Sequence, residues 1–481
     1  MEVNAQPCAH LFMRKQWTNC MTQMEQRQTM NAYTHSRIQR TNESDIYGKD
    51  RLLERMTTPD PTSVRANQLS DADETDKELI TAWRWFYKAK GWNKIAKFES
   101  HGRVGTPYIL YKSKNVVDPN VRAQKLDKAR PITPCCQHPM ARFLRYVGRA
   151  WSFALHRLKG EHFIVHKCGD VPKLFTDFGK QLEGKGALEH IVVDVEGCYP
   201  SMDKSAIRTG MQVVLKKIED ELPHGAGNDP KICVPKRGKK KCTWHCQTNK
   251  VNELDTAVIS FSHMRDALEF VLENTYLRMR DGRLLKQAIG IPMGDSLSPA
   301  IAVGTLAYME MDWMSRLEPE VKERFRAGRF MDDILMVYQK NGWDSRAFVQ
   351  KFERSDCYLP PLRLEAATDG NCFLETKFEL REDGKFRYKL KNLNENLQVP
   401  AVWRYQRYDS FSAQGQKMGV VLGCLKKVAY MASDREGWWY SLCQKLKEFT
   451  ALGYPASILR KACARMYTVT GDRQWLRALR D

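Results

Sequence analysis

Two apolar runs on either side of an acidic pair form the clearest hydrophobic–polar pattern in the chain. The segment Arg329–Tyr338 reads RFMDDILMVY, so Asp332 and Asp333 stand between two short apolar runs. Apolar runs around a short polar pair predict a β-hairpin, whose turn would carry both carboxylates at its tip. Because turns favour Asp in any case, an ordinary solvated turn is the alternative for this segment taken alone.

Two further segments could supply partners for this pair. The β-branched run of residues 191–193 leads into Asp194 and predicts a buried strand that ends on a carboxylate, with Tyr199 five residues later. If this strand lies beside the hairpin, Asp194, Asp332 and Asp333 meet. Three carboxylates make an oxygen-only site suited to Mg²⁺, and two such ions serve phosphoryl transfer to a 3′-hydroxyl.

A glycine-rich segment precedes the hairpin. Gly290 and Gly294 flank Pro292 in the run GIPMGDSLSP and indicate a tight loop. Ser298 followed by Pro299 predicts the start of a helix, with Ser298 as its N-cap. Such a loop can bring backbone close to a ligand or a nucleic-acid strand, although an ordinary loop-to-helix junction has the same pattern.

The rest of the pattern mixes helices and strands and predicts an α+β protein in three regions. Residues 1–75 are polar and weakly periodic, as in a disordered or loosely structured extension. Residues 76–395 form the main body, with a basic insert at about 225–252, and residues 396–481 are mostly helical. Helices are expected over 76–98, 139–158, 203–222 with Asp203 as N-cap, 261–278, 411–431, 435–451 and 456–468, and strands over 107–112 and 373–380.

Composition favours a polyanionic partner. The formal net charge is +20 with a pI near 9.3, which points to nucleic acid before an acidic membrane, a merely soluble basic protein being the alternative. No apolar run is long enough to span a membrane and no signal peptide is visible, so we expect an intracellular protein with mostly reduced cysteines. Neither a Walker-type phosphate loop nor a dinucleotide fingerprint is present.

The basic insert has its own candidates. Lys236–Lys241 is compatible with a nuclear localisation signal, a phosphate contact or a solvated loop. Cys233, Cys242, His245 and Cys246 are close in sequence and could hold zinc, but their irregular spacing favours free thiols.

Jointly, these motifs resemble the palm of a reverse transcriptase, over residues from about 111 to 394. Asp194 with Tyr199 is similar to the first palm motif, residues 290–299 to the second, and FMDD at residues 330–333 to the third. The resemblance implies a right-hand polymerase with fingers, an antiparallel palm sheet with an acidic hairpin, and a helical thumb. It implies RNA-directed DNA synthesis by a two-metal mechanism, from an RNA template, a DNA or RNA primer and dNTPs.

The resemblance also implies roles for individual residues. Asp194, Asp332 and Asp333 would be the catalytic acids and bind two Mg²⁺ ions, for which Mn²⁺ can substitute. Lys128 and Arg130, in the run KARPI, resemble the basic fingers segment that holds the incoming triphosphate. Tyr199 would be a sugar gate that excludes a 2′-hydroxyl on the incoming nucleotide. The loop beside the template and the nascent pair would be shaped by Gly290, Pro292 and Gly294. A lysine near the triphosphate would be Lys377 or Lys391.

Some positions depart from the pattern. Met293 stands where relatives carry glutamine, and Asp295, where many have a small residue, is expected to add negative charge near the template path. The Gly290–Pro292 opening is similar to Penelope-like elements and telomerase, and also to other non-retroviral branches. Gly453–Pro455 resembles the thumb of Penelope-like and some other retroelements, which together suggests a non-retroviral retroelement. No endonuclease or ribonuclease H-like domain is visible. An RNA-dependent RNA polymerase, or an inactive retroelement remnant that binds nucleic acid or protein, remain the alternatives.

Overall fold

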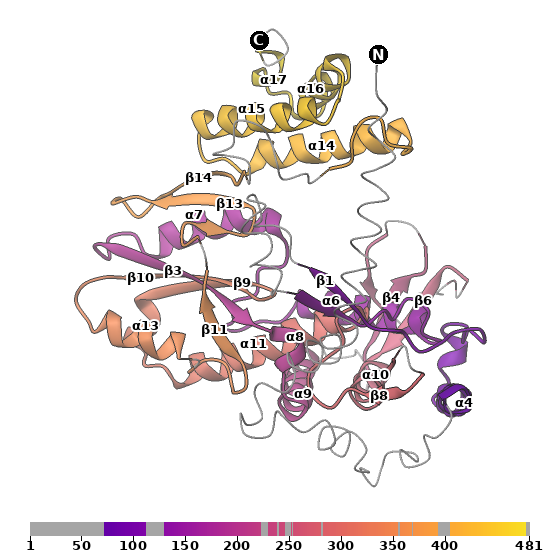
Figure 1. Cartoon of the computed structure of the whole chain (residues 1–481). Coiled ribbons are helices and arrows are strands. Elements are labelled where there is room, and N and C mark those ends of the chain that lie inside the picture. Colours follow the sequence, from indigo (N-terminus) through magenta and orange to yellow (C-terminus); the bar gives the residue numbers. More distant parts are fainter. Residues whose placement is uncertain are drawn as a thin grey trace.

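The computed structural model describes residues 72–111, 129–222, 229–237, 240–245, 252, 254–279, 282–354, 356–367, 369–392 and 405–477. Helices and strands form a central sheet with its helices, a flanking part with small sheets, and a C-terminal helical part (Figure 1). Every pairing between named strands in the described residues is antiparallel. The predicted α+β class is therefore confirmed, whereas residues 1–71 of the expected extension lie outside the described residues.

A four-stranded sheet forms the centre of the molecule. Its strands, in spatial order, are β11 (Arg363–Ala366), β3 (Leu188–Glu196), β10 (Asp333–Gln339) and β9 (Phe325–Phe330). The helices that contribute to the apolar cores on its two faces include α6 (Ala141–Leu155), α7 (Val171–Gln181), α8 (Cys198–Ser201), α9 (Lys204–Asp220), α11 (Ser298–Arg316), α12 (Pro319–Glu323) and α13 (Ser345–Glu353).

Alternation along the strands gives this sheet two apolar faces. Val193 and Ile334 belong to the large core that includes residues of α6, α9 and α11. Val192 and Leu335, each one residue away, belong instead to the core around Phe175 of α7. Because side chains alternate between faces along a strand, each of the two strands is anchored on both sides.

The flanking part packs aromatic residues around α4 (Ala72–Ala89). Trp92 stacks on Phe143 of α6 with ring centroids 4.2 Å apart, and both side chains are fully buried. The helix predicted over 76–98 ends earlier than expected, at Ala89, because Gly91 adopts a left-handed φ of 68° two residues further on. The other elements of this part are η2 (Trp92–Lys94), β1 (Tyr108–Tyr111), β2 (Ala129–Ile132), β4 (Lys231–Pro235), β5 (Thr243–Trp244), β6 (Thr256–Ser260), α10 (Phe261–Glu273), β7 (Tyr276–Arg278) and β8 (Leu284–Lys286).

Two further predicted elements are corrected. The helix expected over 261–278 ends at Glu273, and the next residues form β7, which pairs with β8. The strand expected over 373–380 is broken by Leu374, whose φ of 56° separates β12 (Cys372–Phe373) from β13 (Thr376–Leu380). The basic insert is also ordered in part, since β4 and β5 join β6 in a three-stranded sheet.

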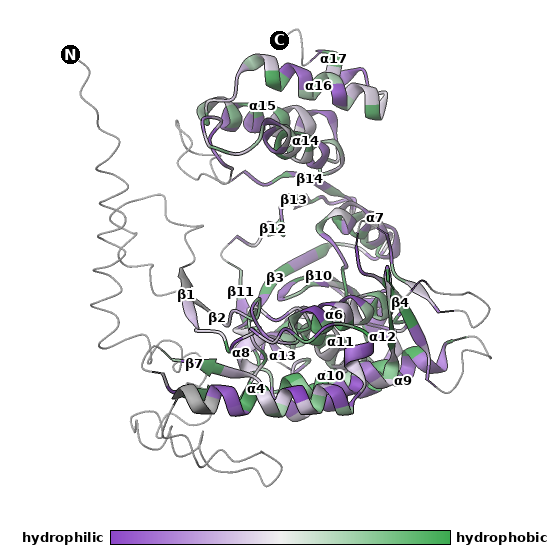
Figure 2. Cartoon of the chain, turned by 90° about the vertical axis from the view of Figure 1, so that its right-hand side faces the viewer, coloured by the Kyte–Doolittle hydropathy of each residue, from purple (hydrophilic) through white to green (hydrophobic). Residues whose placement is uncertain are grey.

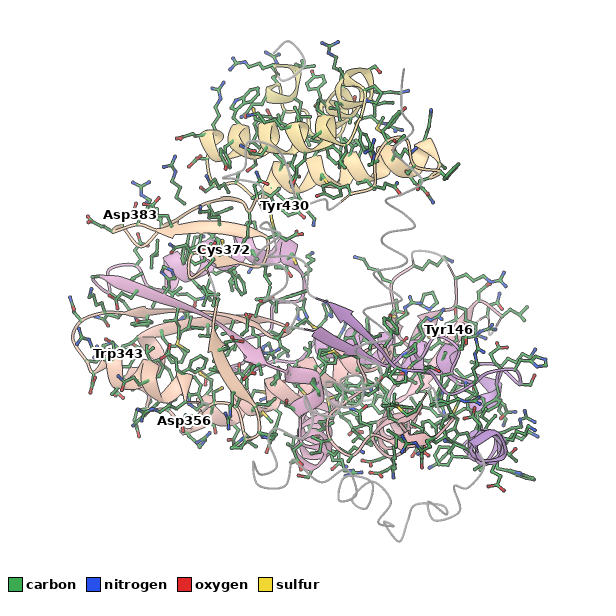
Figure 3. All side chains as sticks on the ribbon, viewed as in Figure 1. Tyr146, Trp343, Asp356, Cys372, Asp383 and Tyr430 are labelled. Carbon is green, nitrogen blue, oxygen red and sulfur yellow. The ribbon has the colours of Figure 1, made fainter. Side chains whose placement is uncertain are left out.

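The C-terminal part is helical, as predicted, and has a core of its own. Its helices are α14 (Gln414–Tyr430), α15 (Arg435–Ala451), α16 (Ala456–Thr470) and α17 (Gln474–Arg477). The hairpin of β13 and β14 (Phe386–Leu390) joins it to the centre, because Arg387 pairs with Asp434 at 2.8 Å and with Glu436 at 2.6 Å. Tyr430, at the end of α14, also reaches toward the centre (Figure 3), within 3.8 Å of where a Cβ on Gly169 of η3 (Cys168–Asp170) would lie.

Hydropathy follows this architecture. Apolar positions gather in the central strands and on the inner sides of the helices around them, whereas the outer sides of the helices are polar (Figure 2). Among the described residues, no helix is both long enough and apolar enough to cross a membrane.

Asp203 allows a test of the local fold. Its side chain accepts a hydrogen bond from the backbone N of Ala206 at 2.9 Å and caps α9, as predicted. Asp203→Ala should lower the free energy of unfolding by about 1 kcal/mol, because an amide at the helix start loses its partner. Asp203→Asn keeps a hydrogen-bond acceptor at the helix start and should lower the free energy of unfolding by only a few tenths of the loss caused by Asp203→Ala. Urea unfolding of both variants measures the difference, and equal losses would contradict the cap.

Candidate active site

The predicted acidic hairpin is present, and its turn has an unusual backbone. Strands β9 and β10 pair antiparallel with Phe330 opposite Asp333, so Met331 and Asp332 form the turn. Met331 has a φ of 58°, a left-handed conformation that costs a side-chain-bearing residue free energy. The turn is also tied to the next strand, because the carbonyl of Asp332 accepts a hydrogen bond from the backbone N of Val195 at 2.8 Å.

The register of the central sheet brings the Asp194 strand to this turn. Asp194 of β3 lies directly opposite Asp333 of β10. Residues directly opposite one another in an antiparallel pair project to the same face, with Cβ atoms roughly 5 Å apart. The three acids that the sequence singled out are thus two cross-strand neighbours and the turn residue beside them.

A further carboxylate extends this row. Glu365 of the edge strand β11 lies opposite Asp194 on its other side, and its side chain is exposed. The row on this face therefore reads Glu365, Asp194, Asp333. Glu365 could not be predicted as part of the site, because β11 is only four residues long. No periodicity in this strand indicates that the strand pairs with β3.

The charges of Asp332 and Asp333 affect the pKa values of different neighbouring side chains. Burial, followed by the charge of Asp332, raises the pKa of Cys198 to about 12. Burial also raises the pKa of Tyr199, with smaller contributions from Cys198 and then from the charge of Asp332. The charge of Asp333 acts instead on Cys168, whose pKa is raised mainly by burial. Asp332 thus lies on the side of the turn that faces α8, and partly buried Tyr199 lies within its field.

The glycine loop lies against Tyr199, and glycine is required there. Gly290 has a φ of 73°, and a Cβ on it would stand 2.5 Å from the carbonyl oxygen of Tyr199. The backbone N of Ile291 donates to that same oxygen at 2.9 Å, and Gly290 N donates to the carbonyl of Met202 at 2.9 Å. The first half of the loop, including buried Pro292, is thereby fixed to the segment that carries the proposed sugar gate.

The second half of the loop lies against the segment that follows β2. A Cβ on Gly294, whose φ is 137°, would stand 2.2 Å from the carbonyl oxygen of Thr133, and Thr133 N donates to the carbonyl of Met293 at 2.8 Å. Strand β2 itself contains Arg130, opposite Leu110 of β1. Lys128 and the side chain of Arg130 lie outside the described residues, so their role stays a prediction.

Two residues of this loop have an environment that the sequence did not indicate. Asp295 is 7% exposed and accepts a hydrogen bond from the backbone N of Leu297 at 2.7 Å, while its expected effect near the template path stays a prediction. Ser298 is not the N-cap but the first helical residue, and its buried hydroxyl has no hydrogen-bond partner. Helix α11 therefore begins on a turn held by Asp295. Burial raises the pKa of this carboxyl to about 6, despite the hydrogen bonds that favour its charged form.

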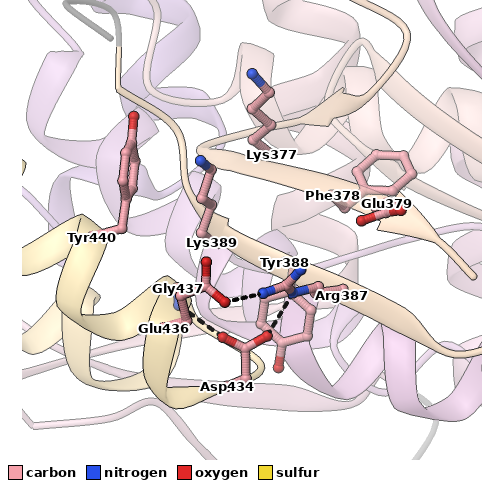
Figure 4. Close-up of a pocket in the computed structure, with 10 residues that line it drawn as sticks. All are labelled: Lys377, Phe378, Glu379, Arg387, Tyr388, Lys389, Asp434, Glu436, Gly437 and Tyr440. Atoms are coloured by element: carbon pink, nitrogen blue, oxygen red, sulfur yellow. Dashed lines mark hydrogen bonds and ion pairs between the residues drawn. The ribbon is translucent and has the colours of Figure 1, made fainter.

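The lysines considered for the triphosphate lie on the connection to the C-terminal helices. Lys377 lines a pocket between the β13–β14 hairpin and α15, where Lys389 stands 3.6 Å from the centre of the Tyr440 ring (Figure 4). Lys391 pairs with Asp369 at 3.6 Å. Neither contact selects one lysine, so this role also stays open.

The donor set at the turn fits Mg²⁺ in its chemistry. Carboxylates are the ligands that Mg²⁺ prefers, and it is commonly held by one or two of them together with water and substrate phosphates. Within the described residues, no group of three His, Cys, Asp or Glu side chains forms a ready-made metal cage. Cys233, Cys242 and His245 of the alternative zinc site are among these described residues, whereas Cys246 lies outside them.

Comparisons with known proteins give similarities of fold. No protein-family model and no curated protein matches the chain. Telomerase from Candida albicans in complex with the TWJ fragment of telomeric RNA is 14% identical over 83% of this chain and 65% of that chain, with a TM-score of 0.48. Apo telomerase from Candida tropicalis is 14% identical over 79% and 61%, with a TM-score of 0.40.

A viral enzyme is similar at a lower level. Sicinivirus 3Dpol, an RNA-dependent RNA polymerase, is 9% identical over 65% of this chain and 55% of that chain, with a TM-score of 0.32. The chain spans less than two thirds of the length of each of these structures. At such identities and TM-scores the similarities carry no argument about function, which has to come from the site itself.

Asp295 predicts a pH-dependent stability. The pKa of this carboxyl is 3.8 in the unfolded chain and about 6 in the folded protein, so the folded protein binds the proton of Asp295 more tightly. The stabilisation that this proton gives is fully present below pH 4 and is lost as the pH rises through 6. Asp295→Asn removes the buried charge but keeps an acceptor for Leu297. It should therefore raise the free energy of unfolding at pH 7.5 by up to about 3 kcal/mol and leave it nearly unchanged at pH 4. Denaturant unfolding of parent and variant at the two pH values measures this difference. An equal gain in the free energy of unfolding at both pH values would show that the buried charge of Asp295 does not cost stability.

Proposed function

We propose that the chain is a right-hand polymerase that carries out RNA-directed DNA synthesis, with the central sheet as palm, the flanking part as fingers and the C-terminal helices as thumb. The observation that carries the proposal is the register that sets Asp194 opposite Asp333 beside the Asp332 turn. Because carboxylates are the ligands that Mg²⁺ prefers, a second acid directly opposite the turn favours a metal site over an ordinary solvated turn. The net charge of +20 supports a polyanionic partner.

Each part of the site has a task in this proposal. Asp194, Asp332 and Asp333 would hold Mg²⁺, which when bound supplies charge for the attacking hydroxyl and the leaving pyrophosphate. Tyr199, fixed by the loop at Gly290, presents its ring beside these acids and would exclude a 2′-hydroxyl on the incoming nucleotide. The segment after β2 is joined to the loop at Gly294, and Lys128 and Arg130, which precede it in the chain, would hold the triphosphate.

Two alternatives predict different behaviour. An RNA-dependent RNA polymerase would not need an aromatic ring at Tyr199 to exclude a 2′-hydroxyl. An inactive remnant would have no reason to keep acids opposite one another in the sheet, as Asp194 and Asp333 are. Both observations favour a working DNA-synthesising enzyme, with an RNA template, a DNA or RNA primer and dNTPs as partners.

Primer extension tests the proposed activity. The purified protein should extend a labelled primer on an RNA template with dNTPs and Mg²⁺ or Mn²⁺. Asp332→Asn should reduce extension by about 10³-fold or more, because it removes a carboxylate where charge develops in the transition state. Asp203→Asn, which alters an acid of the α9 cap, is the matched control and should retain activity. A parent protein that binds RNA but never extends would support the inactive remnant.

Sugar discrimination tests the role of Tyr199. Tyr199→Ala should raise the ratio of rNTP to dNTP incorporation by about 10- to 100-fold, because the clash with the 2′-hydroxyl is relieved. Tyr199→Phe keeps the ring and should keep the preference of the parent. Single-nucleotide incorporation on one primed RNA template measures both ratios. A parent that prefers rNTPs would instead favour the RNA polymerase.

A further inference from the structure

A buried ion pair lies beneath the acidic turn. Arg329 of β9 and Glu310 of α11 form a salt bridge in which both side chains are 0% exposed. Burial alone would favour loss of the Arg329 proton, but the charge of Glu310 and its hydrogen bonds outweigh this, so the pKa of Arg329 is raised. Two full charges out of water need several partners, and the structure supplies them.

Glu310 is the fixed end of this pair. Its Oε1 accepts from the Nε of Arg329 and from the hydroxyl of Tyr358, the latter at 3.0 Å. Its Oε2 accepts from the backbone N of Phe163 at 2.9 Å and from the Nη2 of Arg329 at 3.3 Å. Three chain segments therefore converge on one carboxylate, and each of them orients it.

Arg329 is the end that reaches the turn. Its Nη1 donates to the carbonyl of Met331 at 2.8 Å, and its Nη2 donates to the carbonyl of Val303 at 3.3 Å. The backbone of Arg329 is also paired on both sides, since its N donates to Phe163 at 2.5 Å and its O accepts from Val165 at 2.7 Å. The backbone and the guanidinium of Arg329 are thus both held by hydrogen bonds to segments outside the turn.

The contact to Met331 matters because of its backbone. Met331 keeps a φ of 58° immediately before Asp332, and a conformation of this kind persists only where its surroundings hold it. The bond from Arg329 fixes the Met331 carbonyl, and therefore the peptide that joins Met331 to Asp332. The direction in which the Asp332 carboxylate leaves the turn depends on that peptide.

We propose that Arg329, held by Glu310 and Tyr358, is a positioning residue that sets the acidic turn for metal binding. The inference rests on the proposed function, since it assigns these residues to the same site. Arg329 does not touch the metal or the substrate in this account. It acts through the carbonyl of Met331, and Tyr358 acts one step further away through Glu310.

Two variants separate positioning from simple stability. Arg329→Lys keeps a cation for Glu310 but cannot also donate to Met331 with a fixed planar fork. Tyr358→Phe keeps the buried ring and removes only the hydroxyl that orients Glu310. Glu448→Gln is the matched control, because it breaks another buried salt bridge, with Lys445 in α15, that is remote from the turn in the chain.

The measurements are Mn²⁺ affinity by electron paramagnetic resonance and the Mg²⁺ dependence of primer extension, with thermal unfolding alongside. Arg329→Lys should weaken Mn²⁺ binding and raise the half-saturating Mg²⁺ concentration by about 10- to 100-fold, because partners that orient metal ligands have effects of this size. Tyr358→Phe should shift both in the same direction by less, and Glu448→Gln should shift neither.

The outcomes are distinct. Unchanged metal affinity in a folded Arg329→Lys or Tyr358→Phe overturns the positioning role, as does a loss of rate with no change in the Mg²⁺ dependence. If Arg329→Lys does not fold, Tyr358→Phe decides. A parent that binds Mn²⁺ at Asp332 but extends no primer counts against the proposed function alone, because the change in Mn²⁺ affinity still tests the positioning. A parent whose Mn²⁺ binding is unaffected by Asp332→Asn overturns both.

Discussion

The pairing of β3 with β10 is the interaction on which the candidate site depends. Asp194 and Asp333 are 139 positions apart in the sequence, and only the antiparallel register makes them neighbours. A slip of one residue would turn Asp194 to the other face and move every apolar residue of that strand into the opposite core. The register is specified because both faces are packed: Val193 and Ile334 contribute to one core, and Val192 to the other.

The same constraint extends to the residues around the acids. The loop at Gly290 and Gly294 has no room for side chains, because carbonyl oxygens of Tyr199 and Thr133 occupy that space. Residues from three distant segments are thereby brought to the end of the sheet where the turn lies. The buried pair of Arg329 and Glu310 stabilises the turn through the hydrogen bond from Arg329 to the Met331 carbonyl. Loop, turn and strand end form one assembly, so a change in any of them should be felt at the acids.

Much of this could be predicted from the sequence, for identifiable reasons. The hairpin around Asp332 and the strand before Asp194 are encoded by local apolar runs, and their partnership follows once they are packed. Glu365 could not be found, because the pairing of a four-residue edge strand is decided by tertiary structure. The burial of Asp295 could not be predicted, because a charged residue is rarely buried and here a helix start holds it.

Helix ends and buried polar contacts set the limit of such prediction. Ser298 has the sequence of an N-cap, yet the helix begins one residue earlier than that pattern implies, since Asp295 already holds the turn. The hydrogen bonds of Arg329 to Glu310 and Met331 correspond to no periodic pattern in the sequence, so they could not be predicted from it. The roles of Lys128 and Arg130 remain predictions for a different reason, since their side chains lie outside the described residues.

The most direct test of the central claim is to locate a bound metal ion. Crystals of the protein with a primed RNA template, a dNTP and Mn²⁺ would show manganese by its anomalous scattering. The account predicts anomalous peaks within coordination distance, about 2.2 Å, of carboxylate oxygens of Asp194 and of the Asp332–Asp333 turn, next to the triphosphate. Manganese bound elsewhere, or a nucleotide seated away from Tyr199 with no metal at these acids, would contradict it.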